Sequence, residues 1–246
     1  MRMGEILGLV AGAVVAPVAA AGSFVRRGRI IHRHGVLYRA EVVPEATCGA
    51  ELDVGQRLAG PALVHFTSAL WPLDEARRPD VLGLSVRFRS DAAPSALPAA
   101  GDQDLLFATV RRAWQLLPAL LTTNVQSFLW EDYYALAKFD AGELGLVKWR
   151  IITPRIPGSG ASRAQGLEDA VKAGAAVLQL QVRSVRPGAL YVPLARIRLL
   201  ERVAVGEEAL RFSPFRAGRE IVPRGFLSSL RILPYAASQL ARPRRP

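Results

Sequence analysis

The chain has 246 residues, half of them hydrophobic, which is enough to bury the core of one domain and excludes a wholly disordered protein. Its single cysteine, Cys48, excludes an internal disulfide and a cysteine-based zinc site. The net charge is +11, and among the 32 basic residues only Lys138, Lys148 and Lys172 are lysines. The sequence contains no zinc knuckle, RNP-like strand or helix-turn-helix spacing, so we expect no specific nucleic-acid partner despite this charge.

The first 25 residues differ in kind from the rest. Residues 6–25 carry no charge and consist mainly of Ala, Val, Gly and Leu, which matches the ~20 residues that a membrane span needs. Arg26, Arg27 and Arg29 follow at once, and the positive-inside rule predicts that these arginines, and the domain after them, lie on the cytoplasmic side of the membrane. We therefore expect residues 1–25 to form an apolar helix that associates with a membrane. The alternatives are a cleaved signal peptide of a secreted or periplasmic protein, and a helix packed on its own domain.

The remainder, residues 26–246, is expected to form one domain. Residues 36–43, 62–67 and 82–88 are rich in β-branched and aromatic side chains, which predicts strands of an antiparallel barrel. Residues 104–121 are too apolar for a loop, and the caps available at residues 122–124 predict a helix over 122–134. Further strands are predicted at 147–153, 177–182 and 192–203, with a loop over 154–166 and a helix over 168–179. Residues 212–225 are expected to be irregular and to lead into a terminal helix.

In that terminal helix, Arg231 and Tyr235 are one turn apart and would share a face. A guanidinium beside a phenol favours the ionised phenolate, and a tyrosinate can be the axial ligand of a haem iron. Near the other end runs the motif Arg29-Ile-Ile-His32-Arg-His34-Gly35. This motif resembles the distal-histidine strand of haem catalases, a family that also takes its proximal ligand from Arg-x-x-x-Tyr near the end of the haem domain.

The resemblance extends over residues 26–242 and is strongest at the two ends. Residues 60–68, 80–88 and 104–106 are similar to successive catalase segments, and residues 147–151 and 209–215 look like landmarks of the small catalase-related proteins. That group includes organic-hydroperoxide peroxidases and allene oxide synthases. The resemblance implies an α+β fold, a catalase-like antiparallel β-barrel with surrounding helices, preceded here by the apolar N-terminal helix. It also implies haem b as the cofactor.

By resemblance, His32 is the distal acid/base, which takes a proton from one hydroperoxide oxygen and returns it to the other. Thr67 stands where the family has a serine that orients this histidine. On the opposite side, Tyr235 is the metal ligand, and Arg231 supports it.

Three further positions correspond to the arginines that bind the haem propionates. Arg29 and Arg242 keep the arginine, whereas His65 occupies the third position and is mostly neutral at pH 7. Propionate binding is therefore expected to be weaker or rearranged.

Other departures bear on the activity. Residues 107–109 lack the asparagine that positions peroxide, Leu82 replaces an arginine, and Pro234 interrupts the helix just before Tyr235. We therefore expect a peroxidase or hydroperoxide isomerase, acting on organic or lipid hydroperoxides, rather than a true catalase. The sequence predicts neither the reductant nor the oligomeric state.

Two alternatives remain open. The departures at His65, Leu82 and Pro234 are also typical of a catalase-like domain that has lost haem and serves as a membrane-linked binding or scaffold protein. Alternatively, His32 and His34 on one strand, together with His65, would supply three imidazoles for a zinc hydrolase site.

Overall fold

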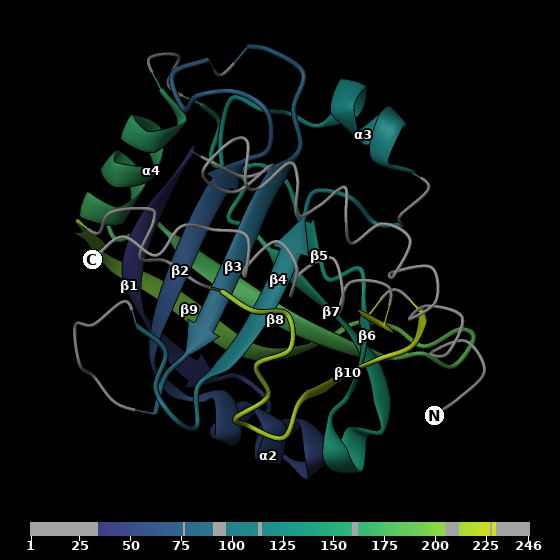
Figure 1. Ribbon diagram of the computed structural model, residues 1–246. Helices are drawn as coiled ribbons and strands as arrows, with labels where there is room; N and C mark the ends of the chain where they lie inside the picture. Colours follow the sequence, from purple (N-terminus) through teal and green to yellow (C-terminus); the bar gives the residue numbers. More distant parts are fainter. Residues whose placement is uncertain are drawn as a thin grey trace, which may run out of the picture.

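A computed structural model describes residues 34–75, 77–90, 97–112, 115–158, 162–204, 212–226 and 228–229. Its main feature is an antiparallel sheet whose strands follow the order β10-β6-β7-β5-β4-β3-β2-β1-β9-β8. β7 also pairs with β8, so the eight strands from β7 round to β8 close into a barrel, while β6 and β10 extend the sheet beyond β7 (Figure 1). The expected antiparallel barrel is therefore confirmed.

The strands and helices have the following bounds. The strands are β1 (His34–Pro44), β2 (Gly60–Ser68), β3 (Leu82–Phe88), β4 (Gln103–Ala108), β5 (Tyr133–Tyr134), β6 (Lys138–Asp140), β7 (Leu146–Ile152), β8 (Val177–Ser184), β9 (Val192–Val203) and β10 (Val222–Arg224). The helices are α2 (Gly49–Leu58), α3 (Leu116–Thr122), the 3₁₀ turn η2 (Gly142–Leu144) and α4 (Arg163–Lys172).

The barrel interior is the hydrophobic core. Trp149 of β7, Phe66 of β2 and Tyr133 of β5 are fully buried there, and the Phe66 ring lies 5.3 Å from that of Phe128. Side chains of a strand alternate between its two faces, so β7 shows the regular buried and half-buried pattern of a strand with one face toward solvent. The strand predicted at residues 147–153 is thus confirmed as β7.

The outer surface of β2, β3 and β4 is different, because it is covered as well. From Ala62 to Ser68, β2 is buried on both faces. Residues 212–221 cross the outside of β3 and β4, as Figure 1 shows in yellow-green on the way to β10. The Asp104 amide donates to the Arg216 carbonyl at 3.1 Å, and the Gly218 amide donates to the Asp102 carbonyl at 3.0 Å. This covered outer face holds the predicted site residues that the structure describes.

Some helices differ from the prediction. Residues 122–134 do not form the expected helix: α3 ends at Thr122, and Tyr133–Tyr134 is a strand. The side chains expected to cap a helix stabilise turns instead, since Asn124 Oδ1 accepts from the Gln126 amide and Glu131 Oε1 accepts from the Asn124 amide. Helix α4 begins at Arg163 rather than at residue 168, because Ser162 Oγ caps it at the Gln165 amide. The expected N-terminal helix lies outside the described residues, as does the expected C-terminal helix except for Phe226, Ser228 and Ser229, which are helical.

Candidate functional site

Two of the predicted site residues, His65 and Thr67, lie two positions apart on β2 and therefore face the same way. Their neighbours Val64 and Phe66 belong to the barrel core, so His65 and Thr67 point to the covered outer face. Thr67 is opposite Gly35 of β1 on one side and Gly83 of β3 on the other. Both side chains are buried, with 2% and 4% of their surface exposed.

Gly35 of β1 lies against both His65 and Thr67. A Cβ atom at position 35 would lie 2.3 Å from His65 Nε2 and 2.7 Å from the Phe66 carbonyl oxygen. Real Cβ atoms do not approach other heavy atoms so closely, so no larger residue fits without displacing β2. The glycine therefore lets the His65 imidazole lie against the backbone of β1.

The imidazole is covered on its outer side by Phe212. The two rings are stacked, with centroids 5.7 Å apart and planes 5° from parallel. The Arg87 guanidinium lies over the same phenyl ring, 4.7 Å from its centroid. His65 is thus enclosed by protein, which is a different environment from that of a cationic side chain extended toward a propionate.

Beside this stack lies a buried ionic cluster that sequence reasoning missed. Arg87 Nε and Nη2 donate to the two carboxylate oxygens of Asp104 at 2.8 and 3.0 Å, and both side chains are fully buried. Asp104 Oδ2 also accepts from Arg216 Nε at 3.1 Å and from the Ser213 amide at 2.8 Å. A buried carboxylate needs such partners, so the cluster fixes residues 213–216 on the barrel. The one available signal was the opposite charges of Arg87 and Asp104, which become adjacent only through the β3–β4 register.

A second missed cluster lies at the end of β2. Ser68 Oγ donates to Asp80 Oδ2 and accepts from Arg163 Nη1 at 2.6 Å, and all three side chains are buried. Asp80 also accepts from backbone amides of residues 69–71 and 81. Burial lowers the pKa of Arg163, whereas the charge of Asp80 acts in the opposite direction. The cluster stabilises the β2–β3 connection, since Asp80 joins the end of β2, the loop that follows it and Arg163 of α4.

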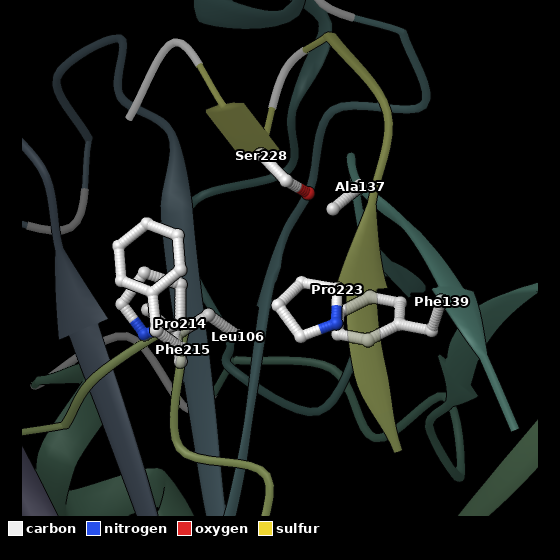
Figure 2. A pocket seen from close by; sticks show the side chains of 7 residues that line it. All are labelled: Leu106, Ala137, Phe139, Pro214, Phe215, Pro223 and Ser228. Atoms are coloured by element: carbon white, nitrogen blue, oxygen red, sulfur yellow. The ribbon is translucent and has the colours of Figure 1, made fainter. Parts of the chain in front are cut away.

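An apolar hollow lies between the chain after Phe212 and β10, as Figure 2 shows. Its walls are Leu106, Ala137, Phe139, Pro214, Phe215, Pro223 and Ser228. The Ser228 hydroxyl donates to the Arg224 carbonyl at 3.2 Å. The free interior is about 10 Å³, enough for one water molecule, so this hollow does not accommodate a haem-sized ligand.

The remaining predicted site residues are His32, Arg29, Arg231, Tyr235 and Arg242, and they lie outside the described residues. Within the described ranges, no group of three or more His, Cys, Asp or Glu side chains is placed to hold a metal. Across the same ranges, no helix is both long enough and apolar enough to span a bilayer.

The β1–β2 register bears on the zinc alternative. Position 34 pairs with Ser68, three residues along β2 from His65, so positions 34 and 65 fall on opposite faces of the sheet. This register argues against a three-imidazole site that needs both.

Comparisons with known proteins identify the architecture. No protein-family model and no curated protein matches the chain. Among solved structures, a fungal catalase superimposes with a TM-score of 0.60 over 87% of this chain. The chain has a catalase-like fold. Its sequence is 13% identical to that catalase, and it spans 60% of the catalase's length. The catalase-like fold is thereby shown, and a catalase-like function remains a proposal.

Proposed function

We propose that this catalase-like domain binds haem and acts on organic hydroperoxides as a peroxidase or hydroperoxide isomerase. The observation that carries the proposal is Thr67, a buried hydroxyl on the outer face of β2, directly opposite Gly35. Because His32 precedes Gly35 by three residues in the sequence, we infer that it would lie on the segment next to Thr67 and form a catalase-like distal pair with it.

The described residues fit haem at one position and not at another. Thr67 keeps the hydroxyl that the resemblance calls for, on a buried surface of the barrel. His65, by contrast, is packed between β1 and Phe212, which does not suit a cationic partner for a propionate. We therefore assign propionate binding to Arg29 and Arg242 and leave His65 out of it.

Tyr235 would hold the cofactor through its phenolate, which the charge of Arg231 stabilises. Haem supplies the redox-active iron at which the O–O bond of a hydroperoxide is cleaved. His32 moves a proton between the two peroxide oxygens, and a hydrogen bond with Thr67 would fix the orientation of its ring. Residues 107–109 lack the expected peroxide-positioning asparagine, and Ala108, in line with Thr67 and Gly83 across the sheet, offers no polar group in its place, which favours an apolar hydroperoxide over hydrogen peroxide.

The test compares the wild type with Tyr235→Phe after reconstitution with haemin. We expect the wild type to show Soret absorption and one iron per chain, and the variant to lose both. Tyr191→Phe is the matched control, because the Tyr191 ring contacts Arg150 of β7 and Arg183 of β8 and phenylalanine keeps that ring. Unchanged iron content in Tyr235→Phe would remove Tyr235 from the role proposed for it.

The enclosure of His65 favours a second candidate function, a haem-free binding or scaffold protein. With Phe212 stacked on the imidazole, one of the three expected propionate partners is committed to protein packing. A wild-type protein that stays colourless and free of iron after reconstitution, while remaining folded, would support this candidate and contradict the haem enzyme.

A further inference from the structure

Four basic side chains form a row on the outside of neighbouring strands. Arg224 of β10 is directly opposite Lys138 of β6, and Lys148 of β7 is directly opposite Arg183 of β8. The β6–β7 register sets Lys138 beside Lys148, so the four positions are continuous across β10, β6, β7 and β8 (Figure 1). At ~4.8 Å between strands, this cationic row spans about 15 Å.

Like charges directly opposite each other on a sheet are destabilising, so the row works against folding. The crowding acts on Lys148, whose pKa is lowered first by burial and then by the charges of Arg183, Lys138 and Arg112. Within the described part of the chain, Lys138, Lys148 and Arg183 form no ion pair, and Arg224 lies 3.7 Å from Asp140.

On β1 and β9, by contrast, arginines at the surface have carboxylate partners. Arg198 lies 2.6 Å from Glu41, and Arg196 lies 3.0 Å from Glu45. Arg39 lies 2.9 Å from Glu201 in the same region. The cationic row is thus a local excess of positive charge that an external anion would relieve.

The aromatic rings near the row indicate which anion it suits. Arg111 lies over the Tyr134 ring at 5.0 Å, and Arg150 and Arg183 lie over the Tyr191 ring at 4.2 and 5.2 Å. Single-stranded nucleic acids bind by stacking bases on open rings, and these rings are already covered by guanidinium groups. The surface therefore offers positive charge for phosphate without a platform for bases.

We propose that the cationic row binds the phosphate headgroups of an anionic membrane surface. The sequence supports this occupant, since residues 6–25 form an uncharged apolar stretch of membrane-spanning length and the net charge is +11. Basic side chains held at the surface of an anionic bilayer strengthen attachment that an apolar segment begins. The proposal does not depend on haem.

The test measures partition of the full chain to phosphatidylcholine vesicles with and without phosphatidylserine, at low and high salt. In the row variant, Lys138, Lys148 and Arg183 are all replaced by glutamine. Because each surface charge adds attraction of the order given for juxtamembrane basic residues, we expect binding to phosphatidylserine vesicles to weaken roughly tenfold or more. Binding to neutral vesicles should not change.

A charge-matched control replaces Arg39, Arg196 and Arg198 by glutamine. This variant also loses three positive charges, but it loses them from arginines that already have carboxylate partners. We expect it to bind phosphatidylserine vesicles nearly as well as the wild type. Equal losses in the two variants would mean that net charge alone attracts the protein, and would overturn the assignment to the row.

Two further measurements complete the test. Replacing Lys138 and Lys148 by arginine keeps the charges and should retain binding. Retained binding would show that the loss in the glutamine variant comes from the missing charge and not from a change of side chain at these positions. A labelled single-stranded oligonucleotide serves as the competing polyanion. If the row variant loses oligonucleotide binding but keeps vesicle binding, the membrane proposal is wrong.

Discussion

The guanidinium of Arg87 and the carboxylate of Asp104 form a two-pronged ion pair on the outer face of the barrel, with neither side chain exposed to solvent. We predict that Asp104→Asn lowers the free energy of unfolding by about 3–5 kcal/mol, because Arg87 is left as a buried charge with a weakened partner. Urea denaturation measures the change. Glu201→Gln is the control, since Glu201 pairs with Arg39 at the surface and should contribute less than ~1 kcal/mol. Similar losses in both variants would contradict this account.

The buried tyrosines Tyr38 and Tyr133 should respond in opposite ways to removal of their hydroxyls. Tyr133 donates to the Phe128 carbonyl at 2.9 Å, so Tyr133→Phe leaves a buried carbonyl without that donor and should cost about 1–3 kcal/mol. The Tyr38 hydroxyl has no hydrogen-bond partner among the described residues. Tyr38→Phe should therefore be neutral or slightly stabilising. Thermal unfolding at pH 7 compares the two, and a larger loss in Tyr38→Phe would show that its hydroxyl is bonded.

Alkaline pH should destabilise the fold through Tyr38. Burial raises the pKa of Tyr38 to about 12, from an ordinary value near ~10, and the nearby charge of Glu168 adds to the effect. Between pH 10 and 12 the unfolded chain releases this proton while the folded chain keeps it, so stability present below pH ~10 is lost as the pH rises. Between these pH values, ionisation of Tyr38 lowers the free energy of unfolding by up to ~1.4 kcal/mol per pH unit.

Tyr38→Phe isolates that contribution. Its free energy of unfolding, measured in urea from pH 9 to 12, should fall less steeply than that of the wild type. Burial also raises the pKa of Tyr133, so a residual slope is expected in the variant. Parallel curves for wild type and variant would mean that Tyr38 ionises equally in both states.

Thr67 should act on turnover rather than on haem retention. If its hydroxyl positions His32, Thr67→Val should lower kcat by about tenfold to a hundredfold with little change in iron content, while Thr67→Ser restores the rate. The pH dependence of kcat should also change in Thr67→Val, because loss of an oriented hydrogen bond shifts the pKa of the His32 imidazole.

Thr153→Val is the control for this experiment. Thr153 is also a buried threonine, and its hydroxyl has no hydrogen-bond partner within the described ranges. Its replacement should leave kcat unchanged. A Thr67→Ser variant as slow as Thr67→Val would point to packing of the methyl group instead of the hydroxyl.

The long strands were predictable both where one face of the sheet meets solvent, as in β7 and β9, and where both faces are covered, as in β2 and β3, whereas the short strands β5, β6 and β10 were not predicted. β9 spans Val192–Val203 as expected, because its exposed arginines alternate with buried residues such as Ile197. Helix α2, Gly49–Leu58, was not predicted: Cys48 provides no side-chain cap, and the helix packs on β1 and β9 through Val54 and Leu58. Tertiary packing, which a local pattern does not contain, stabilises it.

The candidate site likewise combines residues that a local sequence motif reveals with contacts that only the folded chain creates. Thr67 could be found because a short motif carries it, and its burial on the outer face of β2 agrees with a role at a covered site. The enclosure of His65 could not, since Phe212 is 147 positions away in sequence and meets it only across the folded barrel. The Arg87 and Asp104 pair likewise depends on the register between two strands.

The short strand β10, at the end of the sheet order, limits edge-to-edge strand pairing between copies of this protein. Barrel closure between β7 and β8 removes the edge at β8, and at the other end β10 has three residues with Pro223 at its centre. Proline has no amide hydrogen to donate, and so short an edge gives an incoming strand little to pair with. At β10, copies of this protein in a crowded solution therefore have little opportunity for intermolecular β-sheet growth, the usual start of amyloid-like aggregation.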